Sequence, residues 1–413
     1  MARRRRVVLF LQEFSIPLIG GVFAALIAAN IDKAWYDGIV HWKPIPLAAF
    51  GHAVDLHFLV NDVFMVFFFG IAAKEITESI LPGGSLNPFR KAINPLLGTI
   101  GGVVGPVGAF FVLLAMFQAG GSFEGIPDEV VRRGWGIPTA TDIALAWLVA
   151  RTVFGGSHPA VNFLLLLAVA DDAIGLVIIA VFYGDPTHPA EPVWLGLCLA
   201  GMIAAWLLRR QGVRSWVPYI AIGGPLAWCG LLMANLHPAL ALVFIVPFLP
   251  GPKRDTGLFV DQDEVDQAAA GAKPAHEDHS PLHNFEHDLK LFVDVGLFGF
   301  AFANAGVPFT GIGPMTWIIL GALVVGKTVG IGAISWIGIK IGFPLPTGMH
   351  VKDLIMAGFV AALGLTVALF VAGAAFETSP ELLGQAKMGA LFTGFVGIAA
   401  IMIGRMIRIR RSE

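Results

Sequence analysis

Stretches of mainly apolar residues recur along the whole chain, each roughly 15 to 25 residues long, with short breaks rich in Gly, Pro and charge between them. About 20 apolar residues in a helix cross a hydrocarbon core roughly 30 Å thick. The pattern therefore predicts an all-α polytopic membrane protein with twelve transmembrane helices. Their expected ranges are 14–31, 57–80, 95–118, 134–153, 157–183, 193–209, 215–233, 236–250, 288–308, 313–339, 353–375 and 384–406.

Basic residues gather in alternate loops between these spans. One side holds the run Arg3–Arg6 and most of the other Lys and Arg, whereas the opposite side holds only Lys33, Lys43, Arg132, Arg133 and Lys387. Because cytoplasmic loops carry the excess of Lys and Arg, we expect an even number of spans in a cell inner membrane, with both termini cytoplasmic. The basic start and the apolar stretch behind it are interpreted as a retained first helix.

Composition supports this class. The mean hydropathy is +0.76 and 14% of the residues are charged. A net charge of −2 gives no basic face, so no nucleic-acid partner is expected. Cys198 and Cys229 lie in apolar stretches and predict no disulfide framework.

We expect residues 1–413 to form a single transmembrane domain with one long polar insertion, the acidic and His-containing stretch 251–287, as a cytoplasmic loop between spans eight and nine. In a helix, His279, His283 and His287 would share one face and could form a metal or proton site. The alternative is a solvated, mobile loop.

Two spans contain matching interruptions, Pro138–Asp142 in the fourth and Gly364–Thr366 in the eleventh. One such break in each half of a chain is typical of transporters built from inverted-topology repeats, in which two broken helices frame a site near the midplane. We therefore expect spans 4 and 11 to be broken.

The chemistry centres on Asp171 and Asp172, which lie in the middle of an apolar span. A charged side chain there costs about 2.5 to 3.5 kcal/mol, so each needs a partner or a function. A carboxylate poised between protonation states binds a proton or a cation, but not both, and such competition is the basis of exchange transport. The structural alternative is a buried pair satisfied by helix-end donors or a salt bridge.

Three further charges lie within spans. Lys327 needs a counter-ion, for which Asp171 or Asp172 is the natural candidate, either as a releasable partner or in a permanent ion pair. Asp142, close behind Pro138, is either a cation ligand or a charge that offsets half-helix N-termini. Asp62 is more peripheral and fits a helix start or an interface position.

At these residues the chain resembles the NhaA family of sodium/proton antiporters. The matching segments appear in family order between about residues 12 and 410. They are Pro138–Ala144, Asp171-Asp172, Phe302–Val307, Gly326-Lys327 and Ala386-Lys387.

The resemblance implies electrogenic export of cytoplasmic sodium or lithium in exchange for external protons, which serves sodium and pH homeostasis, commonly in a homodimer within membrane lipid. It implies that spans 4 and 11 cross near the midplane. By matching motif, Asp172 is the main carboxylate for sodium and protons, and Asp171 is its partner and accepts a salt bridge from Lys327. The resemblance places Thr141, Asp142 and Thr366 at the breaks as supporting residues.

The family associates the positions of Glu75, Glu286 and His287 with a response to pH, and we group Asp62 and His237 with them. Thr77 and Glu78 stand where the family usually has basic residues, which is a departure in this region.

Other function classes were weighed against exchange. A sodium-coupled organic-solute symporter and a passive cation channel with a carboxylate ring stay open as alternatives. An intramembrane aspartyl protease needs acids from two facing helices, whereas the pair here is contiguous. We therefore expect a secondary transporter that is no enzyme and needs no cofactor.

Overall fold

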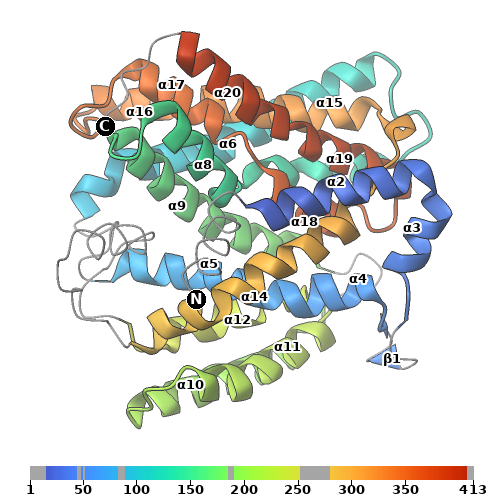
Figure 1. The fold of residues 1–413 in the computed structure, drawn as a ribbon, viewed down its shortest axis with the longest axis vertical. Coiled ribbons are helices and arrows are strands. Elements are labelled where there is room, and N and C mark those ends of the chain that lie inside the picture. The colour runs from blue at the N-terminus through green and yellow to red at the C-terminus, as the bar shows by residue number, and fades with distance from the viewer. Residues whose placement is uncertain are drawn as a thin grey trace, which may run out of the picture. The chain divides into compact units, whose positions relative to one another are not determined.

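The computed structural model describes residues 15–43, 48–49, 52–81, 89–184, 190–251 and 280–406 (Figure 1). Within them the fold is all-helical, as expected, apart from an antiparallel pair of two-residue strands, β1 (Ala48–Ala49) and β2 (His52–Ala53). The chain divides into two compact units. Unit 1 comprises Met1–Asn61, Ile93–His188 and Asp294–Glu413, and unit 2 comprises Asp62–Ala92 and Pro189–Val293.

Unit 1 contains the helices around Asp142, Asp171, Asp172 and Lys327. They are α2 (Ile16–Ile31), α3 (Lys33–Val40), α4 (Leu56–Phe58), α6 (Phe89–Ala119, from Ile93 on), α7 (Asp128–Arg132), η2 (Arg133–Thr139), α8 (Ile143–Phe154), α9 (Pro159–Phe182), η7 (Phe309–Gly311), α15 (Pro314–Gly321), η8 (Ala322–Gly326), α16 (Lys327–Lys340), α17 (Val351–Val360), α18 (Leu365–Ala375), α19 (Pro380–Phe392) and α20 (Gly394–Met406).

Unit 2 is smaller, and its helices α10 and α11 lie side by side (Figure 1). Its elements are most of η1 (Leu59–Phe64), α5 (Met65–Ile80), η3 (Pro192–Trp194), α10 (Leu195–Arg210), η4 (Tyr219–Gly223), α11 (Gly224–Met233), η5 (Pro238–Leu240), α12 (Ala241–Ile245) and η6 (Val246–Phe248). Helix α14 (Pro281–Asn304) begins in unit 2 and ends in unit 1.

Six helices in the described part of the chain are long and apolar enough to cross a membrane. They are Leu56–Ile80, Ala92–Ala119, Pro159–Phe182, Pro192–Arg210, Pro314–Lys340 and Pro380–Met406. Three helices are likewise apolar but shorter, namely Ile16–Ile31, Tyr219–Met233 and Pro238–Phe248. The chain is thus a multi-pass membrane protein.

Two further helix pairs are interrupted by short breaks. Asp128–Thr139 and Ile143–Phe154 meet at 47°, and Val351–Val360 and Leu365–Ala375 meet at 50°. Pro138 lies just before the first break, where its ring removes a backbone donor, and Gly364 lies at the second. The interruptions therefore fall where the sequence has its helix-breaking residues.

Helices α6 and α16 cross at very close range because glycines face each other. A Cβ atom on Gly101 would lie 2.1 Å from the carbonyl oxygen of Gly330, and one on Gly105 would lie 2.3 Å from that of Gly326. On each side of the crossing the two glycines are four residues apart, Gly101 and Gly105 on α6, and Gly326 at the end of η8 with Gly330 on α16. This small-x-x-x-small spacing lets helix backbones approach closely in a membrane. The close crossing places the start of α16, with Lys327, beside α6.

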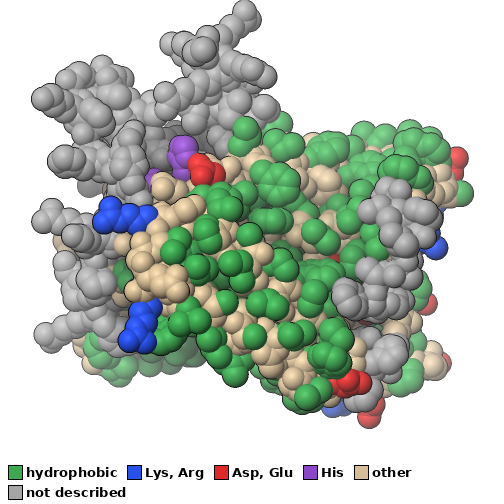
Figure 2. Space-filling model, turned by 90° about the horizontal axis from the view of Figure 1, so that it is seen from below, with side chains coloured by type: hydrophobic (Ala, Val, Ile, Leu, Met, Phe, Trp, Pro, Cys, Tyr) green, Lys and Arg blue, Asp and Glu red, His purple; other side chains and the backbone are tan. Residues whose placement is uncertain are grey.

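The outer surface is rich in apolar side chains. Figure 2 shows one face on which hydrophobic side chains cover much of the middle, with the charged ones near its margins. Large residues such as Ile31 and Met406 are 80% and 81% exposed. A surface of this kind suits contact with lipid tails.

The polar stretch expected at 251–287 is only partly within the described residues. Residues 252–279, including His276 and His279, lie outside them. Helix α14 begins at Pro281, so the last part of that stretch is helical and the helix starts earlier than the expected 288. His283 and His287 stack on one side of this helix, with ring centroids 6.4 Å apart.

Candidate functional site

Asp171 and Asp172 lie near the middle of α9, which begins with His158 as its N-cap and Pro159 in its first turn. The apolar run before them continues the helix without a break, so both acids are carried into the interior of unit 1. Asp171 is fully buried and Asp172 is 9% exposed. As neighbours on one helix they point about 100° apart and face different surroundings.

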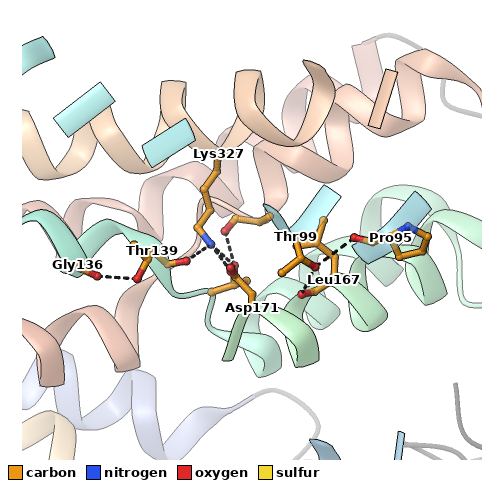
Figure 3. Close-up of polar contacts among 9 residues, drawn as sticks. Pro95, Thr99, Gly136, Thr139, Leu167, Asp171 and Lys327 are labelled. Atoms are coloured by element: carbon orange, nitrogen blue, oxygen red, sulfur yellow. Dashed lines mark hydrogen bonds and ion pairs between the residues drawn. The ribbon is translucent and has the colours of Figure 1, made fainter. Parts of the chain in front are cut away.

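Lys327, the first residue of α16, directs its ammonium group at Asp171 (Figure 3). Its Nζ donates to the carbonyl oxygen of Thr139 at 2.7 Å, to Thr141 Oγ1 at 2.8 Å and to Asp171 Oδ2. All three ammonium protons are therefore used, and both charged groups are completely buried. Of the two carboxylates predicted as the counter-ion of Lys327, the structure pairs it with Asp171.

Thr141 lies in the first break and contacts Lys327, Asp171 and the carbonyl of Ala361. Its hydroxyl accepts from Lys327 and lies 2.8 Å from Asp171 Oδ2 and 3.0 Å from the carbonyl oxygen of Ala361. A hydroxyl has one proton to donate, so it can bond the carboxylate or the carbonyl at one time. The contact with Ala361 links the break in η2–α8 to the break in α17–α18.

Asp142 lies where two helices begin. Its Oδ1 accepts from the backbone amide of Leu145 at 3.1 Å as the N-cap of α8. Its Oδ2 accepts from the amide of Thr366 at 3.1 Å and from the Thr366 hydroxyl, in the first turn of α18. A negative charge at two helix N-termini is electrostatically favourable.

The C-terminal end of η2 faces Lys327, and the C-terminal end of α17 lies next to Thr141. Thr139 is the last residue of η2, and its free carbonyl accepts from the ammonium group. Ala361 follows α17, and its carbonyl lies next to Thr141. The negative end of η2 is thus compensated by a cation, and the positive ends of α8 and α18 are compensated by Asp142.

This arrangement offers oxygen ligands of the kind that alkali cations prefer. Asp171 Oδ1 is buried and has no hydrogen-bond partner among the described residues, although its Oδ2 has two. No group of three or more His, Cys, Asp or Glu residues that could hold a metal ion occurs in the part of the chain that the structure describes. The chemistry available is reversible binding of a proton or a monovalent cation at carboxylates.

A second buried charge cluster lies in unit 2. Lys74 on α5 forms ion pairs with Glu78, at 2.7 Å, and with Glu286 on α14. Lys290 lies 3.9 Å from Glu286, and Glu75 is electrostatically coupled to the same group. The predicted residues Glu75 and Glu286 therefore belong to one cluster, whose central cation the sequence did not single out.

The other residues grouped with a pH response lie elsewhere. The side chain of His287 is 71% exposed and contacts Asp288 at 3.3 Å. Asp62 and His237 lie together in unit 2, with 3.7 Å between Oδ1 and Nδ1. Trp228 donates to the backbone oxygen of Asp62 at 2.7 Å.

The chain is similar to known proteins over nearly its whole length. The family model described as Na+/H+ antiporter 1 matches residues 11–406. A protein named Na(+)/H(+) antiporter NhaA from Geobacter sulfurreducens is 56% identical over 408 residues, with 99% of each chain covered. The protein of that name from Desulfitobacterium hafniense is 54% identical, covering 100% of this chain and 98% of its own. A solved sodium proton antiporter, MjNhaP1 from Methanocaldococcus jannaschii, superposes with a TM-score of 0.48 at 14% identity, covering 94% of this chain and 96% of its own.

Proposed function

Because the chain belongs to the Na+/H+ antiporter 1 family, we propose that it exchanges sodium or lithium ions for protons, and that Asp171 and Asp172 are the groups for which these ions compete. The observation that carries this proposal is the fully buried contact between Asp171 and Lys327. A cation that binds at Asp171 takes the place of the ammonium group as its positive partner.

Lys327 has other acceptors when it releases Asp171. The carbonyl of Thr139 and the hydroxyl of Thr141 lie at 2.7 and 2.8 Å from its Nζ. Thr141 can then turn its own proton from the carboxylate to Ala361, which frees Asp171 Oδ2 for the cation. Thr141, Asp142, Lys327 and Thr366 thus support the site, while Asp172 supplies the neighbouring carboxylate.

Two carboxylates give a basis for electrogenic exchange. Asp171 and Asp172 can take up two protons where one sodium ion binds, so a cycle of this kind moves net charge. Exchange then follows alternating access: sodium binds from the cytoplasm as protons leave, the site opens to the outside, and protons displace sodium there.

The proposal includes twelve spans, and the apolar helices of the described residues support it. The six long helices, the two bent pairs, the three shorter apolar helices and α14 supply that number when each pair is taken as one broken span. The twelve spans, the inverted repeats with broken spans 4 and 11, the inner membrane, the cytoplasmic termini and the homodimer are part of this proposal.

The pH response is proposed for the cluster of unit 2. Glu75 and Glu286 share the electrostatic field of Lys74, so protonation of either acid changes the charge balance around this buried lysine. His287, and the pair formed by Asp62 and His237, are assigned to the same response as ionisable groups that contact one another or an acid.

The test uses purified protein in proteoliposomes with a proton gradient reported by a pH-sensitive dye. Sodium or lithium added without any organic solute should dissipate the gradient, and potassium should not. Asp172→Asn and Asp171→Asn should each abolish the response while the protein stays folded. Asp128→Asn, which neutralises an exposed acid contacting Arg132, serves as the matched control and should exchange normally.

Three outcomes would reject the assignment. Normal exchange by Asp172→Asn would remove the carboxylate from the mechanism. A requirement for an organic solute would indicate a symporter. A sodium current without proton movement would indicate a channel.

A further inference from the structure

Lys387 on α19 is a second buried lysine of unit 1, and its surroundings differ from those of Lys327. It is 8% exposed, and its Nζ donates to Asn304 Oδ1 at 3.3 Å. Among the described residues no Asp or Glu carboxylate lies within 4.0 Å of it, whereas Lys327 contacts Asp171 directly. An ammonium group buried without a counter-charge is strongly disfavoured, and the neutral amine relieves the penalty.

Asn304, the acceptor of Lys387 among the described residues, is held in place by bonds from its amide nitrogen. The amide nitrogen of Asn304 donates to Asn61 Oδ1 at 2.9 Å and to the carbonyl oxygen of Phe300 at 3.1 Å. This fixes which end of the amide is the oxygen, so that Oδ1 faces the lysine. Asn61 and Asn304 are both buried, at 7% and 3% exposure. The three side chains form a built polar site away from the Asp171 contact.

A series of titratable groups leads from this site to the surface. His57 on α4 lies within electrostatic reach of Lys387. The rings of His57 and His41 have centroids 5.9 Å apart, and His41 Nδ1 lies 2.9 Å from Asp55 Oδ2. The side chain of His41 is 61% exposed, so the series begins in solvent and ends at a buried amine. Each imidazole ring has one nitrogen that can accept a proton and one that can donate it.

The ionisable groups around Lys387 in the described residues supply no counter-charge for its ammonium group. Lys33 on α3 is within electrostatic reach but forms an ion pair with Asp37. Helices α15, α18 and η7 pack against α19 and contain no ionisable side chain. Of the charged residues on η2 and on α19 itself, Arg133 donates to Gly184 and Glu381 accepts from Gln385. Arg405 lies in the last turn of α20, which also contacts α19.

We propose that Lys387 is a second proton-binding group of this protein, separate from Asp171 and Asp172, that exchanges protons with the medium through His57 and His41. In the uptake step a proton leaves the His57 imidazolium and forms the third N–H bond of the Lys387 ammonium, and His57 regains a proton from the side of His41. The loops around Lys33 and Lys387 are poor in basic residues, which assigns this route to the external face. As a step in antiport the route rests on the proposed function.

Proton counting tests the site without requiring transport. Purified protein in detergent is acidified from about pH 9 to about pH 6, and a pH indicator reports the protons taken up. Lys387→Arg keeps the charge but cannot release its proton, so it should take up one proton fewer per chain than the unaltered protein. Lys33→Arg, at an exposed and ion-paired lysine, should match the unaltered protein. Equal counts for Lys387→Arg and Lys33→Arg would overturn the proposal.

Exchange in proteoliposomes tests the functional step. With Lys387→Arg, the rate should lose its dependence on pH at the external face, while the sodium concentration for half-maximal rate changes less than about twofold. A pH dependence identical to that of Lys33→Arg would overturn this step. Absence of sodium-driven proton movement in the unaltered protein would instead reject the antiport function, and the proton count would still decide the site. The two failures are therefore distinguishable.

Discussion

Asp142 accepts two hydrogen bonds from Thr366, one from its backbone amide at 3.1 Å and one from its hydroxyl. Since Asp142 also caps α8 through Leu145, a single carboxylate joins the first turns of α8 and α18. The two helices come from opposite halves of the chain. The first turns of α8 and α18 are therefore held together by the buried carboxylate of Asp142 and its hydrogen-bond donors.

Replacing Thr366 tests the share of the hydroxyl in this contact. Thr366→Val keeps the shape of the side chain but removes one donor to a buried carboxylate, and we expect a loss of about 1 to 3 kcal/mol in the free energy of unfolding. Thr366→Ser retains the hydroxyl and should lose less. Thermal unfolding in detergent measures both variants. Equal stabilities would contradict a role for this hydrogen bond.

The ion pair of Lys327 and Asp171 predicts non-additive effects. Lys327→Met leaves a fully buried carboxylate without its cation and should destabilise the protein by about 3 to 5 kcal/mol. The double variant Lys327→Met with Asp171→Asn removes both charges and should recover part of that loss. A double-mutant cycle on thermal unfolding measures the coupling. A double variant that is no more stable than Lys327→Met would show that the pair is not coupled.

The glycine contact between α6 and α16 predicts a position-specific effect. Gly101→Ala forces a methyl group against the backbone of Gly330, which cannot rotate away, so we expect a loss of at least about 2 kcal/mol. Gly108→Ala on the same helix meets nothing within 4 Å and should be neutral or slightly stabilising. Thermal unfolding of the two variants in detergent decides between them. Similar values would refute the close crossing.

The cluster around Lys74 predicts a pH-dependent loss. Lys74→Met leaves Glu78 and Glu286 without their shared ammonium partner and should destabilise the protein by roughly 3 kcal/mol near neutral pH. The loss should shrink in acid, because protonated carboxyls need no cation. Lys290→Met, at a half-exposed lysine 3.9 Å from Glu286, should have a small effect at either pH. Unfolding curves at several pH values test this, and a constant loss for Lys74→Met would contradict it.

The sequence predicted the central residues because charges in apolar spans need partners. That argument linked Lys327 to the acids of α9, and the structure pairs it with Asp171. For Asp142 it left two roles open, a cation ligand or a charge at half-helix N-termini, and the structure has its carboxylate at the starts of α8 and α18. Pro138 and Gly364 are visible in the chain, and the structure has two helix pairs bent at breaks beside them. That each pair is one broken span stays a prediction. Hydropathy thus predicted the all-helical, multi-pass class, while the number of spans and the roles of the site residues stay predictions.

Other features could not be predicted, for physical reasons. The carbonyls of Thr139 and Ala361 act through the backbone, and any residue type supplies one. The burial of Lys74 and Lys387 depends on which helix faces meet, which a single sequence does not specify. The pairing of Asp62 with His237 joins residues far apart in the chain without a shared pattern. The roles assigned to Glu75, Glu286, His287, Asp62 and His237 stay predictions.

Helix η8 (Ala322–Gly326) is a π-helical segment directly before Lys327, and it determines the direction in which this lysine points. A π-helical turn holds about one residue more than an α-helical turn, so the residues after it are rotated relative to those before it. One residue corresponds to about 100° around a helix axis. Deleting a single residue from 322–326 would return α15 and α16 to one continuous α-helical register and turn the lysine away from Asp171. The extra residue of the π-helical turn therefore sets the rotation of α16 that directs the Lys327 amine toward Asp171.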